Sequence, residues 1–304
     1  MEIVLETNNL EKKYKDFRAL NHTNMHIEKG AIYGLVGKNG AGKTTLIRII
    51  CGLQEPTSGE YILYDKSNKN SGIITVRKRM GAIIETPSIY GEMSARDNLI
   101  EQYKLVGMPS LDGIEELLKL VGLEETGKKK TKNFSLGMKQ RLGIAIALAG
   151  NPDFLILDEP INGLDPKGII EIRELILKLN KERKITILIS SHYLDELSKI
   201  ATHYGFLDNG SIIQEITNEE LMKKMEHKIE LKVSKVKEFV KYFEENKISY
   251  EVIDSKNINV YGENNLSKFI TELSQKNLIA DEIHEKEESL ENYYMNLIGG
   301  DNDD

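Results

Sequence analysis

Short apolar runs alternate with stretches of helical periodicity over roughly the first 215 residues of this chain. The runs at 32–36, 154–157 and 185–189 are each followed by a turn and then by a helical pattern. Apolar runs of this length are typical of strands buried on both faces, and strands that alternate with helices pair in parallel. The pattern therefore predicts an α/β fold in which helices cover a largely parallel sheet.

Between Glu85 and Gly150 the pattern becomes helical. Strand-like runs are few here, and leucines recur at helical spacings at positions 99, 105, 117, 118 and 120. We therefore predict a helical subdomain, residues 86–150, inserted into an α/β domain that spans residues 1–215.

The composition becomes more charged after Asn218, and a second set of elements begins. Strand-like stretches are expected near 229–233, 250–253, 258–261 and 279–283, with helices at 236–246 and 266–275. The resulting order β-α-β-β-α-β is typical of a split βαβ unit. We predict a small α+β module of ferredoxin-like type over residues 216–304.

Composition and charge narrow the functional classes. The chain has 304 residues, a net charge of -7 and one cysteine. An acidic balance argues against a nucleic-acid binder, and the lysine run at 128–132 has no interleaved aromatic residues, so we interpret it as a solvated loop. A single cysteine excludes an intrachain disulfide and favours a reducing cytoplasm. Because the apolar runs are far shorter than the roughly 20 residues of a membrane span, any transport pathway is expected on another polypeptide.

The segment after the first apolar run matches the phosphate-loop pattern G-x-x-x-x-G-K-[ST], and it lies between a predicted strand and a predicted helix. Such a loop curls backbone N–H groups around phosphate oxygens at a helix N-terminus. Its lysine reaches the β and γ phosphates and its hydroxyl can bind Mg²⁺. The alternative is a Gly-rich turn. The nucleotide-binding residues expected here are Gly37, Lys38, Asn39, Gly40, Ala41, Gly42, Lys43, Thr44 and Thr45.

Two adjacent carboxylates follow the apolar run at 154–157. Asp158 and Glu159 would lie at the carboxyl end of a buried strand, where ligands bind in open α/β sheets. Asp158 can hold Mg²⁺ through its water shell, and Glu159 can accept a proton from the water that attacks the γ-phosphate. The alternative is a strand that merely ends in an acidic turn.

The segment 134–141, Phe-Ser-Leu-Gly-Met-Lys-Gln-Arg, precedes this strand and resembles the signature motif of ABC transporter ATPases, whose usual core is L-S-G-G-Q. Ser135 is a good N-cap for the helix that follows, and a simple cap is the alternative interpretation. Leu136 and Met138 depart from the usual core, whereas Ser135 and Gly137 are retained. The resemblance implies an ABC-type P-loop NTPase core in which Ser135 and Gly137 face the γ-phosphate held by the opposite subunit.

Four further residues are assigned from this resemblance. Asp165 in Asn-Gly-Leu-Asp resembles the D-loop, which crosses the dimer interface, and His192 after an apolar strand resembles the switch histidine. Tyr14 resembles the aromatic residue that stacks on adenine, unless it is an ordinary strand tyrosine. Glu85 stands where most of the family carries the Q-loop glutamine, and it could bind Mg²⁺ or water. With the following Thr-Pro-Ser, it resembles the bacitracin and lantibiotic resistance branch, although neutral drift explains it equally well.

The resemblance implies a homodimer that holds two ATP molecules with Mg²⁺ and drives a separate transmembrane permease from the cytoplasmic face of the membrane. An antimicrobial peptide or bacitracin-like antibiotic is the expected cargo. One rival is an exporter ATPase for lipid, polysaccharide or sodium. A more distant rival is a soluble ABC protein that acts on ribosomes or DNA, although such proteins typically carry two cassettes or long inserted arms.

Overall fold

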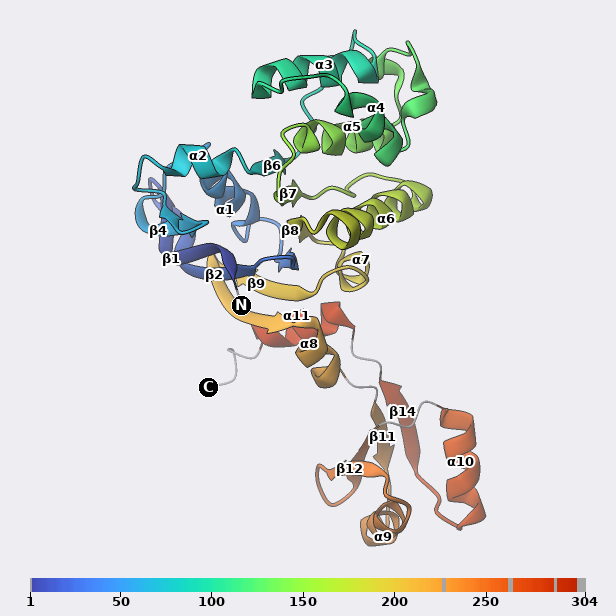
Figure 1. Cartoon of the computed structure of the whole chain (residues 1–304). Helices are drawn as coiled ribbons and strands as arrows, with labels where there is room; N and C mark the ends of the chain where they lie inside the picture. The colour runs from blue at the N-terminus through green and yellow to red at the C-terminus, as the bar shows by residue number, and fades with distance from the viewer. Residues whose placement is uncertain (1, 226–227, 262–264, 287–288, 300–304) are drawn as a thin grey trace. The chain divides into compact units, whose positions relative to one another are not determined.

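The computed structural model describes residues 2–225, 228–261, 265–286 and 289–299. The chain divides into two compact units, Met1–Asn218 and Glu219–Asp304 (Figure 1), so the division falls a few residues after the boundary expected from composition. Among the described residues, no helix combines the length and apolar character that a bilayer span requires.

A six-stranded sheet forms the centre of the first unit. Its order is β10-β9-β3-β8-β7-β6. All neighbours pair in parallel except β10 and β9, which are antiparallel, so the predicted largely parallel sheet is confirmed. The strands are β3 (Ile32–Val36), β6 (Met80–Ile83), β7 (Phe154–Asp158), β8 (Thr186–Ser191), β9 (His203–Asp208) and β10 (Ser211–Thr217).

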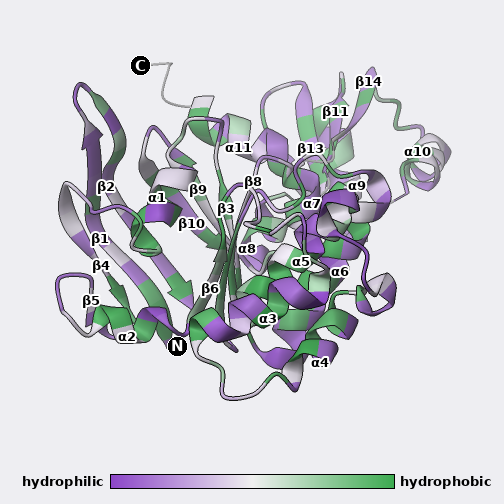
Figure 2. Ribbon diagram, turned by 90° about the horizontal axis from the view of Figure 1, so that it is seen from above, coloured by the Kyte–Doolittle hydropathy of each residue, from purple (hydrophilic) through white to green (hydrophobic). Residues whose placement is uncertain are grey.

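A second, antiparallel sheet has the order β2-β1-β4-β5. It comprises β1 (Ile3–Tyr14), β2 (Phe17–Glu28), β4 (Ser58–Leu63) and β5 (Lys66–Ser67), and α2 (Ile73–Arg77) follows it. Helix α1 (Lys43–Ile50) contributes Leu46 and Ile50 to one core cluster with Leu5 of β1 and Ile156 of β7. Burial of these apolar side chains holds α1, and hence the loop before it, between the two sheets. Figure 2 shows the hydrophobic positions concentrated along the central strands.

Three helices follow β6: α3 (Ala95–Val106), α4 (Gly113–Leu120) and α5 (Leu136–Leu148), with single 3-10 turns at Glu124–Thr126 and Thr131–Asn133. They pack on one another and form the green group in Figure 1. Ser94 begins α3 with a capping box, in which its side chain accepts from the backbone of Asp97 and the Asp97 carboxylate accepts from Ser94. Helices α6 (Pro166–Arg183) and α7 (Leu194–Ser198) follow β7 and β8.

The second unit contains α8 (Asn218–Lys224), β11 (Lys228–Lys232), α9 (Val236–Asn246), β12 (Ser249–Val252), β13 (Asn257–Tyr261), α10 (Leu266–Gln275), β14 (Glu282–Lys286) and α11 (Leu290–Gly299). Its antiparallel sheet has the order β12-β13-β11-β14, and Phe239, Phe243 and Phe269 of α9 and α10 pack against one face. The last strand begins later than the predicted 279–283. Ile283 pairs with Leu231, whereas Ile279 is 79% exposed and lies before the strand.

Candidate nucleotide-binding site

The loop between β3 and α1 has the strand-loop-helix setting that the sequence predicts. Gly40 and Gly42 adopt φ angles of 84° and 113°, a region that disfavours residues with a Cβ. A Cβ on Gly42 would also lie 2.5 Å from the carbonyl oxygen of Ala19 on β2. Both sterics and backbone conformation therefore require glycine at position 42, directly before the first turn of α1.

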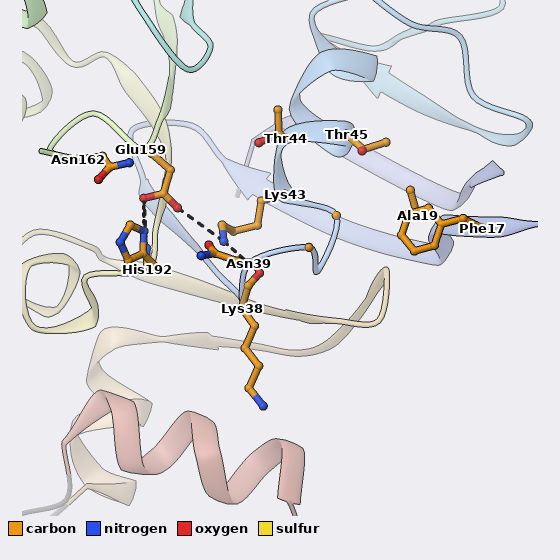
Figure 3. Close-up of a pocket in the computed structure, with 12 residues that line it drawn as sticks. Phe17, Ala19, Lys38, Asn39, Lys43, Thr44, Thr45, Glu159, Asn162 and His192 are labelled. Carbon is orange, nitrogen blue, oxygen red and sulfur yellow. Dashed lines mark hydrogen bonds and ion pairs between the residues drawn. The ribbon is translucent and has the colours of Figure 1, made fainter. Parts of the chain in front are cut away.

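A cavity of about 520 Å³ opens beside this loop (Figure 3). Nine of its lining residues were expected from sequence, and Phe17, Ala19 and Asn162 were not. Of the remaining loop residues, Gly37 contributes a carbonyl that binds the Lys43 ammonium. The lining residues are Phe17, Ala19, Lys38, Asn39, Gly40, Gly42, Lys43, Thr44, Thr45, Glu159, Asn162 and His192.

Glu159 lies between two nitrogen groups in this cavity. Its Oε1 is 3.6 Å from Nζ of Lys43, and its Oε2 is 2.7 Å from Nδ1 of His192 (Figure 3). Lys43 is almost fully buried and donates to the backbone carbonyls of Gly37 at 2.6 Å and Lys38 at 3.3 Å. The arrangement brings a cation for phosphate and a carboxylate able to accept a proton to one wall of the cavity.

The backbone of Glu159 is itself unusual. Its φ of 51° is in the left-handed region, which costs a residue with a Cβ about 1 kcal/mol or more. The Glu159 N–H lies 3.0 Å from Oγ and 3.2 Å from the carbonyl oxygen of Ser190 on the adjacent strand β8. These contacts hold a conformation that turns the carboxylate out of the strand direction and toward Lys43.

Asp158 and Thr44 form a second polar contact at the loop. The Thr44 hydroxyl donates to Oδ2 of Asp158 at 2.9 Å, and the Ser190 hydroxyl donates to Oδ1 at 2.5 Å. Ser190 is fully buried and thus contacts both carboxyl residues, a role that the sequence analysis missed. The sequence could have indicated this role, because Ser190 lies at the end of the strand beside the carboxylate pair.

Ser135, Gly137 and Asp165 lie elsewhere, in a separate hollow of about 450 Å³. Ser135 is the N-cap of α5 and accepts from the backbone N–H of Met138 at 3.3 Å, which confirms the predicted cap. Asp165 is the N-cap of α6 and accepts from the N–H of Gly168 at 3.0 Å. Two helix N-termini therefore open into one hollow, which is a favourable environment for an anion.

The aromatic residue that lines the cavity is Phe17, not the expected Tyr14. The two residues pair across the turn between β1 and β2. The Tyr14 hydroxyl hydrogen-bonds with the side chain of Gln54, in the loop after α1, while Phe17 is 60% exposed beside Ala19. Tyr14 does not line the cavity, and its stacking on adenine stays a prediction.

Glu85 also has a partner that the sequence did not indicate. Its carboxylate lies 2.6 Å from Nη2 of Arg48 on α1, one turn beyond Thr44. This ion pair uses one oxygen of the Glu85 carboxylate, and a role of Glu85 in binding Mg²⁺ or water stays a prediction. Glu85 has a φ of 62°, the left-handed region that is seldom populated by residues with a Cβ.

Cys51 follows α1 and has no place in this chemistry. Burial raises the pKa of its thiol to about 12, and the neighbouring Arg77 only partly offsets that effect. The thiol therefore stays protonated, as expected for a small residue packed against the core.

Known proteins resemble this chain over different extents. The family model described as ABC transporter matches residues 20–162. The bacitracin transport ATP-binding protein BcrA of Bacillus licheniformis is 40% identical, over 99% of this chain and 99% of that protein. The lantibiotic transport ATP-binding protein SrtF of Streptococcus pyogenes is 45% identical, over 70% of this chain and 90% of that protein.

Among solved structures, a dimeric structure of the ATP-binding cassette MJ0796 in a post-hydrolysis state, bound to ADP and Pi, superimposes with a TM-score of 0.64. The two sequences are 26% identical, over 70% of this chain and 98% of that chain. This likeness confirms the α/β P-loop NTPase fold of the ABC type.

Proposed function

The chain belongs to the ABC transporter family of ATP-binding subunits and is an ATPase; from this premise we propose that it powers a separate membrane permease that exports a bacitracin-like antibiotic or another antimicrobial peptide. The observation that carries the cargo assignment is the extent of the likeness to BcrA. That match covers 99% of the chain, and so includes the second unit, whereas the match to SrtF covers 70%. The full-length likeness favours bacitracin-like cargo over lantibiotics.

The cavity residues have distinct roles in ATP hydrolysis under this proposal. Lys43 and the backbone N–H groups of the phosphate loop bind and orient the β and γ phosphates. Glu159 accepts a proton from the attacking water, and His192 holds the Glu159 carboxylate while its ring faces the γ-phosphate. The contact of 2.7 Å between Glu159 and His192 supports this division of roles.

The oxygen atoms of Thr44 and Asp158 fit a Mg²⁺ site. The hydroxyl and the carboxylate are already in contact at 2.9 Å, and Mg²⁺ characteristically uses one or two protein oxygens together with water and phosphate. When bound, Mg²⁺ neutralises charge on the phosphates. Ser190 would then hold Asp158 in place through its other carboxylate oxygen.

We further propose that two copies sandwich ATP. Ser135, Gly137 and Asp165 line a hollow separate from the cavity of Lys43, so one chain does not bring the two sets of residues together. A twofold dimer would place the hollow of each copy over the cavity of the other. The dimeric cassette bound to ADP and Pi supports such an arrangement.

The other parts of the chain fit this assignment. We propose an ATPase domain, residues 1–215, with an inserted helical subdomain at 86–150, and an accessory domain at 216–304. The sheet order β12-β13-β11-β14 of the latter supports a ferredoxin-like module. We place the protein in the cytoplasm, at the inner face of the membrane through its permease.

The proposal is tested by expressing the chain with the membrane protein that co-purifies with it from native membranes. Cells carrying both should tolerate more bacitracin than cells carrying the permease with the Glu159→Gln variant, because only turnover drives export. Protection against lantibiotics alone would move the cargo to the other class. Recovery with ribosomes and without a membrane protein would overturn the transport assignment.

A further inference from the structure

Helix α5 contacts the loop before α6 through Leu136 and contacts α6 itself through Arg141. We infer that these contacts form a brace that sets the spacing of the two helix N-termini in the second hollow, with Leu136 and Arg141 as positioning residues. This inference rests on the proposed ATP sandwich, because it concerns how one copy presents that hollow to nucleotide on the other.

The first contact joins Leu136 to Gly163. Leu136 is the first residue of α5, and a Cβ on Gly163 would lie only 3.2 Å from its Cδ2. Gly163 has a φ of 75° and lies two residues before Asp165, the N-cap of α6. Glycine at position 163 therefore allows both the positive φ of the turn and the close approach of the Leu136 side chain. Leu136 stands where the usual signature core has glycine.

The second contact is made by Arg141. Its Nη2 lies 3.5 Å from Oε2 of Glu171 on α6. Its Nη1 donates to the carbonyls of Val121 at 2.9 Å and Gly122 at 3.0 Å, just after α4. Gly122 has a φ of 65°, and a Cβ there would lie 2.8 Å from Nη1. Gly122, a second glycine with positive φ, thus makes room for the guanidinium of Arg141.

Two separated contacts restrain the helices more than one contact can. Arg141 lies five residues beyond Leu136, about 7.5 Å along the helix axis. A single contact would let α5 pivot against α6, whereas contacts at both positions fix their relative orientation. Glu171 also lies 3.9 Å from Lys167, which lines the hollow, so the brace extends to a cation beside it.

The brace is expected to affect the assembly of two copies around ATP. Ser135, the N-cap of α5, and the first turn of α6 both line the hollow. A change in the spacing of the two helices would therefore misplace their N–H groups relative to a phosphate that both contact. None of the residues that make the two contacts lines the cavity of the phosphate loop, where Asn162 is their nearest neighbour in sequence. Loss of the brace should therefore weaken ATP-dependent dimerisation and leave binding of ADP to the loop intact.

The experiment uses the full chain carrying Glu159→Gln, which is expected to block turnover. The ATP concentration that gives half dimer is measured by sedimentation, and the affinity for fluorescent mant-ADP is measured on the same samples. Leu136→Ala and Arg141→Gln should each raise that ATP concentration about tenfold, and together by less than the product of the two. Leu136→Met, which retains an apolar contact, should stay within about threefold of the parent.

Glu174→Gln is the matched control, because Glu174 is an exposed carboxylate on the same helix, and it should behave as the parent. Unchanged half-dimer concentrations in Leu136→Ala and Arg141→Gln would overturn the brace. A parallel loss of mant-ADP affinity would also overturn it, since the two residues would then act on the whole fold. A parent that stays monomeric at every ATP concentration would refute the sandwich, and the brace with it.

Discussion

The Nδ1 atom of His192 lies 2.7 Å from Oε2 of Glu159, and this contact joins the ends of two adjacent parallel strands. His192 follows β8 and Glu159 follows β7. The other oxygen of the carboxylate lies 3.6 Å from the Lys43 ammonium. With the Glu159 carboxylate as acceptor, Nδ1 of His192 is the donor, and Nε2 remains for a hydrogen bond with the nucleotide.

Replacing His192 by glutamine should lower kcat about 10- to 100-fold, because Glu159 loses the group that orients it. The KM for ATP should change less than about threefold, since Lys43 and the loop remain. A steady-state phosphate-release assay measures both constants. His203→Gln is the control, because His203 lies on β9 and its imidazole is 3.8 Å from Glu28. A kcat equal to that of the unmodified chain would remove His192 from catalysis.

Ser190→Ala should impair both carboxyl residues. The Ser190 hydroxyl donates to Asp158 at 2.5 Å and accepts from the Glu159 N–H at 3.0 Å. We expect kcat to fall about tenfold, and unfolding to become easier by about 1–3 kcal/mol because buried polar groups lose a partner. Urea denaturation and ATPase assays measure the two effects.

Ser191→Ala provides the comparison for Ser190→Ala. Ser191 is equally buried, but its hydroxyl accepts from the backbone N–H of Tyr193 at 2.9 Å. We expect this variant to lose some stability and to keep its kcat. Equal losses of kcat in both serine variants would show that the effect on turnover is general to the strand end.

Glu85→Gln should leave the Mg²⁺ dependence of the ATPase close to that of the unmodified chain. Its carboxylate is paired with Arg48, whereas Thr44 and Asp158 are in contact at the loop. We expect the Mg²⁺ concentration for half-maximal activity to change less than about twofold in Glu85→Gln and to rise at least about tenfold in Thr44→Val. A rise in Glu85→Gln as large as that in Thr44→Val would instead identify Glu85 as a metal ligand.

Asp97→Asn should lower stability in a pH-dependent manner. Hydrogen bonds from the Ser94 hydroxyl and backbone N–H hold the pKa of the Asp97 carboxyl below its usual range. A depressed pKa in the folded state contributes stability above the pKa of the unfolded chain, and that stability is lost as pH falls through the folded pKa. We expect a difference of about 0.5 kcal/mol near pH 7 that shrinks as pH falls below 4.

Denaturant titrations of the unmodified chain and Asp97→Asn at several pH values measure this difference. Asp112→Asn is the control, because Asp112 begins α4 without a side-chain cap. A difference that is independent of pH would assign the effect of Asp97→Asn to packing and not to the charge of the capping box.

The local elements and the identity of the phosphate loop could be predicted from the amino-acid sequence alone. Strand β3 and helices α9 and α10 have their predicted bounds, because apolar periodicity and capping residues are properties of short segments. The glycines of the loop were likewise readable, since their spacing reflects a backbone that must curl around phosphate. Ser135 was recognisable as a helix cap for the same local reason.

Which side chains contact one another could not be predicted in this way. Ser190 reaches Asp158 and Glu159 because β7 and β8 are neighbours in the sheet, a pairing that no local pattern specifies. Glu85 is paired with Arg48, 37 residues earlier, through the placement of α1, and Leu136 meets Gly163 through the packing of α5 on α6. Contacts between distant segments depend on how elements pack, and packing is a property of the whole fold.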